Sequence, residues 1–159
     1  MIQRIQTLYL FLIVVLGTLL CFFSPVGFAT AENAETFRIL TMSFTGIYDM
    51  TNPELSVRLM NTVSLGIISV MIPLLALIDI FIYKKRILQA RLNVITVVLC
   101  LGWYAVLAVY VWFAKMNYYV EWYITPWAAI PLVNMVLTLM ATRAILKDEA
   151  LVRAADRLR

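Results

Sequence analysis

Few residues of this chain have the type and spacing that catalysis or ion binding requires. Asp79 is the strongest candidate for such a role. The sequence contains no histidine, which removes the commonest general base and most zinc and haem sites. Its two cysteines, Cys21 and Cys100, form no CxxC pair, so a thiol–disulfide exchange centre is not indicated. A glycine-rich phosphate loop is also missing from the sequence. The sequence therefore predicts a protein that is not an enzyme and uses no cofactor.

Asp79 lies in an apolar run, about one turn before the basic cluster Lys84-Lys85-Arg86. An ionisable residue at membrane depth is by default a candidate for binding an ion or a proton. A structural ion pair is the favoured interpretation, because the basic cluster can reach back towards the carboxylate. Asn93 and Asn134 are further candidates, since a carboxamide inside a membrane span seeks a hydrogen-bonded partner. We expect these three residues to serve in polar packing between helices, with the lining of a conduit as the alternative.

Long apolar runs must position these residues. Hydrophobic residues make up 64% of the 159-residue chain and its mean hydropathy is +0.91, whereas about half of a soluble domain is apolar. Four runs each approach the ~20 residues that a bilayer requires. The sequence predicts one all-α integral membrane domain over residues 1–159, a four-helix transmembrane bundle. Its helices are expected over about residues 4–29, 59–83, 92–114 and 122–146.

The first apolar run imitates a signal peptide. A basic start precedes it, and Ala29-Thr30-Ala31 follows as a cleavage-type motif. The run is slightly long for the apolar region of a signal peptide. We therefore expect a retained first membrane helix.

The longest polar stretch separates the first two helices and forms an external loop over residues 30–58. Its segment 37–48 is rich in β-branched and aromatic residues, which favours a short β-hairpin as much as an irregular loop. Pro126 and Pro131 fall within the last predicted helix. We expect them to kink it and to open a crevice between helices.

Basic residues predict the orientation of the chain. With the amino terminus in the cytoplasm, ten of the thirteen lysines and arginines fall on the cytoplasmic side. The other three are Arg38, Arg58 and Lys115. The positive-inside rule therefore predicts that both termini are cytoplasmic. This distribution accounts for the net charge of +4, so a nucleic-acid partner is not indicated.

The chain ends in a charged tail, residues 147–159, with the sequence KDEALVRAADRLR. Glu149 and Arg153 stand four residues apart in the order that stabilises a helix. We expect the last membrane helix to continue into the cytoplasm. Basic residues at this end are the candidates for contacts with anionic lipid head groups or with an acidic partner: Arg143, Lys147, Arg153, Arg157 and Arg159.

Both ends of the chain carry a family resemblance. The opening MIQRIQTLYL and the close RAILKDEALVRAADRLR resemble the termini of small four-pass membrane proteins typical of the Bacteroidota. That family is known only as a domain of unknown function. The resemblance implies a multi-pass protein of the bacterial inner membrane. It supplies no activity, cofactor or catalytic residue.

Three functions remain open. The first is a non-enzymatic accessory or scaffold subunit that packs on a larger membrane complex, which the absence of catalytic motifs and the structured basic tail favour. The second is a conduit or carrier for a small solute or a lipid, acting as an oligomer. The third is adhesion through the external loop, as in claudin-like proteins, although the W-GLW-C-C signature of that group is missing.

Overall fold

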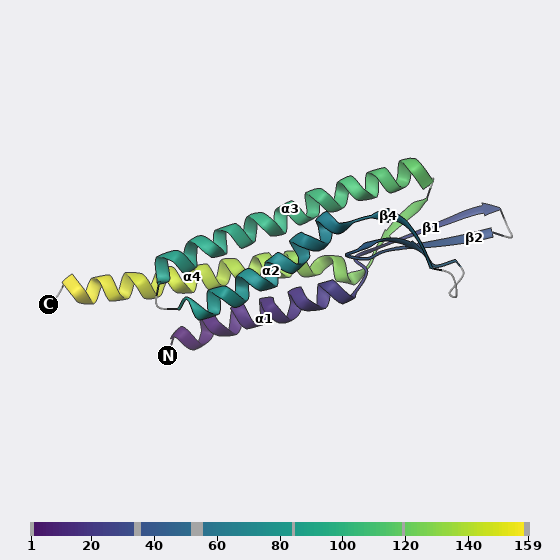
Figure 1. Cartoon of the computed structure of the whole chain (residues 1–159). Coiled ribbons are helices and arrows are strands. Elements are labelled where there is room, and N and C mark those ends of the chain that lie inside the picture. The colour runs from purple at the N-terminus through teal and green to yellow at the C-terminus, as the bar shows by residue number, and fades with distance from the viewer. Residues whose placement is uncertain (1, 34–35, 52–55, 84, 119, 158–159) are drawn as a thin grey trace.

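Four long helices form the body of the protein (Figure 1). The computed structural model describes residues 2–33, 36–51, 56–83, 85–118 and 120–157. The helices are α1 (Ile2–Phe22), α2 (Val63–Phe81), α3 (Arg86–Tyr118) and α4 (Ile130–Arg157), and a short 3-10 helix, η1 (Pro126–Ala129), precedes α4. Each of the four is long and apolar enough to cross a bilayer. They form a closed ring in which α1 and α3 each pack against both α2 and α4.

A five-stranded antiparallel sheet lies at one end of the bundle, so the prediction of an all-α fold is wrong. The strands are β1 (Val26–Asn33), β2 (Thr36–Met42), β3 (Gly46–Asp49), β4 (Val57–Asn61) and β5 (Glu121–Ile124), in the spatial order β4-β3-β2-β1-β5. The β2–β3 pair covers most of the segment considered as a possible hairpin over residues 37–48. Both described ends of the chain lie at the opposite end of the bundle (Figure 1). We call the two ends the sheet end and the termini end.

The strands shorten three of the predicted helices at the sheet end, whereas α3 continues to Tyr118, four residues beyond its expected end at 114. The first helix was expected to reach residue 29 but ends at Phe22, because Ser24-Pro25 cannot continue it and β1 follows. The helix expected over 122–146 begins only at Ile130, since 121–124 pair with β1. Pro126 and Pro131 stand in the first turns of η1 and α4, where proline is tolerated. They therefore begin these helices instead of kinking one long helix.

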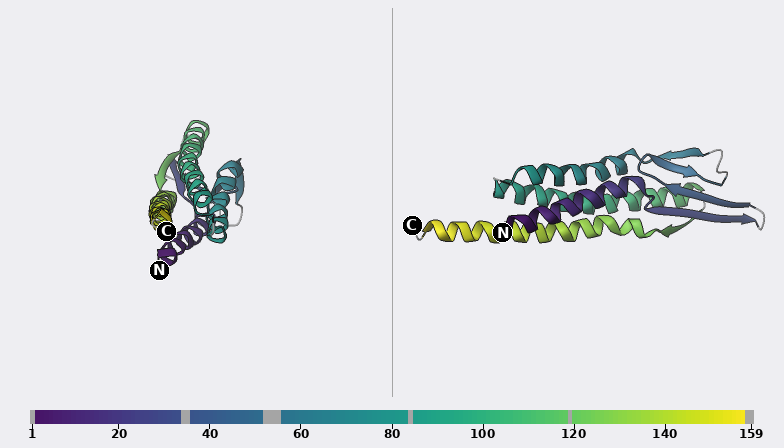
Figure 2. Two further views of the ribbon diagram at one scale, coloured as in Figure 1. Left: turned by 90° about the vertical axis from the view of Figure 1, so that its left-hand side faces the viewer. Right: turned by 90° about the horizontal axis from the view of Figure 1, so that it is seen from below.

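At the termini end α3 begins earlier than expected, at Arg86 instead of residue 92, whereas α2 ends at Phe81, two residues before the expected 83. Helix α4 continues through most of the tail to Arg157. Figure 2 shows α4 reaching beyond the other three helices.

Buried residues recur at alternating steps of three and four along the helices, the spacing of a coiled-coil seam. In α2 the stripe is Leu65, Ser69, Ile72, Ala76 and Asp79, and in α3 it is Gln89, Asn93, Thr96, Cys100, Trp103 and Leu107. The corresponding residues of α1 are Gln6, Leu10, Ile13, Gly17 and Leu20. The outward positions are apolar instead. The helices therefore bury their more polar faces against one another, as expected for a bundle whose outer surface meets lipid.

One hydrophobic core joins the sheet to the helices at the sheet end. Trp103 of α3, Leu65 of α2 and Phe28 of β1 are at most 1% exposed and belong to the same cluster. The indole Nε1 of Trp103 donates a hydrogen bond to Ser69 Oγ (2.8 Å). Helix α2 approaches the β2–β3 turn so closely that a Cβ on Gly66 would lie 2.4 Å from the carbonyl oxygen of Phe44. The sheet and the helices thus share one hydrophobic core.

An ion pair supports the outer part of the sheet. Arg38 Nε of β2 lies 3.1 Å from Asp49 Oδ2 of β3, and the backbone N–H of Thr51 donates to Asp49 Oδ1 (3.0 Å). Burial raises the pKa of Asp49, but the hydrogen bonds from Thr51 and the charge of Arg38 outweigh it. The pKa of this carboxyl therefore lies below its ordinary value.

Candidate functional site

Asp79 is a buried carboxylate at the termini end of α2. Its side chain is 1% exposed, and neither carboxylate oxygen has a hydrogen-bond partner among the described residues. An isolated ionised carboxylate inside an apolar bundle costs several kcal/mol. The site therefore has unused capacity to accept hydrogen bonds or to hold a positive charge.

Three carboxamides are buried in the same half of the bundle. Gln89 of α3 is 3% exposed and donates through Nε2 to the backbone oxygen of Asp79 (3.3 Å). The amide nitrogens of Asn93 and of Gln6 are buried without a hydrogen-bond partner among the described residues. The contact between Gln89 and Asp79 sets the level at which α2 faces α3, and Asn93 follows one turn later. The structure thus brings two of the predicted residues, Asp79 and Asn93, to neighbouring levels of facing helices.

Asn134, the third predicted residue, belongs to a different level of the bundle. Tyr104 Oη contacts the backbone of Ala128 and Leu132, which places the start of α4 opposite the middle of α3. In this register Asn134 lies about 10 Å further towards the sheet end than Asn93, or roughly seven residues of helix. It is 1% exposed and its Oδ1 has no described partner. Asn134 is therefore a buried packing residue separate from the cluster around Asp79.

Of the basic residues expected to pair with Asp79, the two that the structure describes form no ion pair with it. Arg86 contacts α4, with Nη2 at 3.2 Å from Asp148 Oδ2 and Nη1 at 3.8 Å from Glu149 Oε2. Lys85 is exposed, and Lys84 lies outside the described residues. No ion pair to Asp79 is found in the described part of the chain, and Arg86 instead fixes the α2–α3 turn to the root of the tail.

All of the predicted lipid-contact residues except Arg159 lie along the termini-end half of α4. Arg143 and Lys147 are exposed on that helix. Arg153 and Arg157 lie on its last turns, but their side chains are outside the described set, as is the whole of Arg159.

Within the described residues, no group of three histidine, cysteine or acidic side chains could hold a metal ion. Cys21 and Cys100 are both free. What the described side chains provide is a set of buried hydrogen-bonding groups and a basic end.

Sequence reasoning missed Gln6, Gln89 and Trp103. Their signal is the heptad spacing, because Gln89, Asn93, Thr96, Cys100 and Trp103 follow one another at steps of four and three. A stripe of polar and small residues at that spacing in an otherwise apolar helix marks the face that meets other helices.

The chain belongs to the family described as a domain of unknown function, DUF4293, whose family model matches residues 2–158. This confirms the family expected from the terminal sequences. No match is found among the curated proteins. The family description names no activity.

Proposed function

We propose that this protein is a non-enzymatic scaffold or accessory subunit that holds a small β-sheet at a membrane surface as a docking platform for a larger membrane complex. The observation that carries the proposal is the core shared by sheet and helices. Because β1, β2 and β3 contribute Phe28, Leu40 and Ile47 to the same cluster as Trp103, the sheet cannot move freely on the bundle.

Neither outer strand of this platform pairs with a further strand in the part of the chain that the structure describes, although Tyr118 Oη of α3 donates to the backbone oxygen of Leu59 in β4 (3.2 Å). The sheet ends at β4 on one side and at β5 on the other, and an unpaired strand edge is a template for another chain. Val57 of β4 is 51% exposed and Ile124 of β5 is 64% exposed. Phe44, in the turn between β2 and β3, adds a further exposed apolar side chain (42%).

The proposed location is the bacterial inner membrane, with both termini in the cytoplasm and the sheet outside. Charge supports this orientation, since Arg86, Arg91 and Lys147 are at the termini end while Arg38 and Lys115 are at the sheet end. In this orientation the basic residues of α4 face the anionic head groups of the inner leaflet.

Affinity purification of the tagged full chain in mild detergent, followed by mass spectrometry, tests the proposal. We expect a stoichiometric membrane-protein partner with the wild type. The double variant Phe44→Asp, Val57→Asp places charge on the exposed sheet surface and is expected to lose that partner. Val57 is exposed, whereas Phe44 also lies against α2, so loss of the partner supports the proposal only if thermal unfolding of the variant stays close to that of the wild type.

Leu151→Asp is the matched control, since Leu151 is 53% exposed on the tail at the other end of the molecule. It should retain the partner. A partner that is lost from the Leu151 variant but kept by the sheet variant contradicts a sheet platform, and a wild-type protein that is purified without any partner contradicts the scaffold function.

A second candidate is a conduit or carrier for a proton or small cation, which the unpartnered carboxylate of Asp79 favours. Apolar side chains fill the bundle between this site and the sheet, among them Ile72, Cys100 and Trp103, so a continuous polar path is not supported. Proton or sodium flux in proteoliposomes that Asp79→Asn abolishes would favour this candidate over the scaffold.

A further inference from the structure

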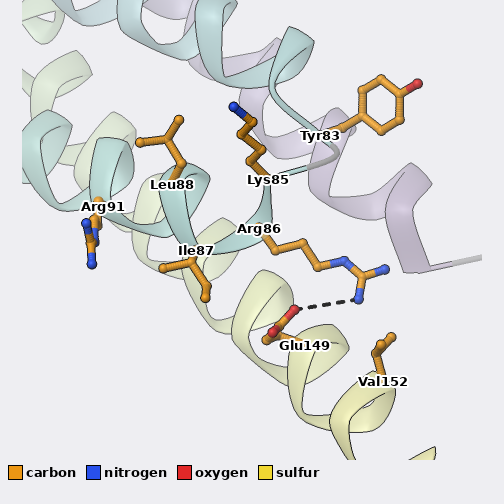
Figure 3. Close-up of a pocket in the computed structure, with 8 residues that line it drawn as sticks. All are labelled: Tyr83, Lys85, Arg86, Ile87, Leu88, Arg91, Glu149 and Val152. Carbon is orange, nitrogen blue, oxygen red and sulfur yellow. Dashed lines mark ion pairs between the residues drawn. The ribbon is translucent and has the colours of Figure 1, made fainter. Parts of the chain in front are cut away.

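Two adjoining cavities form a groove between α3 and α4 at the termini end. The first has a volume of about 790 Å³ and includes Lys85, Arg91 and Val152 in its lining (Figure 3). The second has a volume of about 500 Å³ and includes Val94 and Leu146. Both are lined by Ile87, Arg91 and Glu149, so they are parts of one groove.

The mouth of the groove carries positive charge that the described acids leave uncompensated. Arg86 is turned to Glu149 and also pairs with Asp148 (Figure 3). Lys85 and Arg91 point away from that pair, in directions different from each other, and take part in no ion pair among the described residues. The excess of basic over acidic side chains therefore favours the binding of an anion at the mouth of the groove.

The inner part of the groove is apolar and open to the side of the bundle. Ile87, Val94 and Leu146 line it and are 52%, 58% and 54% exposed, on the surface of spans that face lipid. From Ile87 to Val94 the helix advances about 10 Å towards the middle of the membrane. A ligand that fits must therefore be anionic at one end and apolar over the adjoining length.

We propose that this groove binds one anionic phospholipid, with its phosphate at Arg91, which lines both cavities, with Lys85 adding positive charge at the rim, and with the upper part of an acyl chain along Ile87, Val94 and Leu146. Amino and guanidinium groups are the usual ligands of phosphate in proteins. A phospholipid is chosen over an acidic protein helix because the apolar part of the groove opens into the bilayer. This site differs from the diffuse attraction expected of the tail, and it does not depend on the scaffold function.

Native mass spectrometry of the full-length protein in detergent tests the proposal, with dioleoylphosphatidylglycerol as the anionic probe and dioleoylphosphatidylcholine as the zwitterionic one. We expect one tightly retained molecule of the anionic lipid and weaker retention of the other. The double variant Lys85→Gln, Arg91→Gln should weaken the binding of the anionic lipid about 30-fold, the factor expected when two basic residues are lost.

The matched control is Arg143→Gln, Lys147→Gln, which removes the same charge from the same end of the molecule but from residues that line neither cavity. It should keep the anionic lipid. An equal loss in both double variants would show diffuse electrostatic attraction and overturn the proposal.

Filling the groove provides a test that leaves the charge unchanged. Val94→Trp places a large side chain in the apolar part and should displace both lipids while leaving thermal unfolding close to that of the wild type. Unchanged lipid retention in this variant overturns the acyl-chain part of the site. Inorganic phosphate should compete only weakly; full displacement of the lipid by millimolar phosphate would show a plain phosphate site instead.

Discussion

Replacing Gly66 with alanine tests whether α2 and the sheet are packed as one unit. Gly66 lies in the second turn of α2, beneath the turn between β2 and β3. A Cβ at this position would lie 2.4 Å from the carbonyl oxygen of Phe44 and 3.3 Å from its carbonyl carbon. The neighbouring atoms are backbone, so no side-chain rotation can relieve the contact.

The expected cost follows from this geometry. An ordinary contact between a carbon and an oxygen is about 3.3–3.6 Å even when weakly attractive, so helix and turn must separate by roughly 1 Å. Overpacking of this kind costs about 1–3 kcal/mol. Replacing glycine with alanine inside a helix also stabilises the helix by about 1 kcal/mol. This gain partly hides the cost of the clash, so the measured change in stability must be corrected for it.

Gly102→Ala supplies that correction. Gly102 lies within α3, and a Cβ there would meet nothing within 4 Å. Both variants share the helix-propensity gain, so the difference between them reports the clash alone. For a chain of this size about 1 kcal/mol shifts Tm by 2–4 °C, which puts the Tm of Gly66→Ala about 2–12 °C below that of Gly102→Ala. Thermal unfolding in one detergent measures it, and equal Tm values would refute the close packing of sheet on bundle.

Three further variants test the buried and surface polar groups by thermal unfolding. Ser69→Ala removes the acceptor of the Trp103 indole and should cost about 1–3 kcal/mol, because a buried donor is left unsatisfied; an unchanged Tm would contradict this hydrogen bond. Asp79→Asn keeps the shape but removes a carboxylate that has no described partner, so it should raise stability by about 1–3 kcal/mol; a fall would reveal a stabilising partner of the carboxylate. Asp49→Asn should lower Tm at neutral pH. A lowered carboxyl pKa stabilises the fold above the unfolded-state pKa and loses that effect as pH falls through the folded-state pKa. The difference from the wild type should therefore begin to shrink below about pH 4 and vanish only below the folded-state pKa, and a constant difference would contradict the assignment.

Part of the candidate site was visible in the sequence. Asp79 stood out because a single acid in an apolar run is costly wherever the helix packs. The residues that surround Asp79 could not be predicted, because residue spacing alone does not say which helices face each other. The contact of Gln89 with the Asp79 backbone depends on the register between α2 and α3, and that register is fixed by packed pairs such as Ser69 and Trp103.

The ion pairs also depend on helix contacts that the sequence does not reveal. Sequence proximity favoured a contact from the Lys84-Lys85-Arg86 cluster back to Asp79. The structure turns Arg86 to Asp148, which is 62 positions away along the chain but adjacent across the α3–α4 interface. A flexible basic side chain pairs with the nearest acid in space, and only the arrangement of helices decides which acid that is.

The sequence by itself determined four helices long and apolar enough to cross a membrane and the unequal distribution of basic residues between the two ends. Both follow from the free energy of transferring each residue between water and lipid, which adds up along a segment whatever its neighbours are. The sheet was decided only by the tertiary structure. Val26 pairs with Ile124, nearly a hundred residues away, and strands as short as β5 gain their hydrogen bonds from partners that no local pattern reveals.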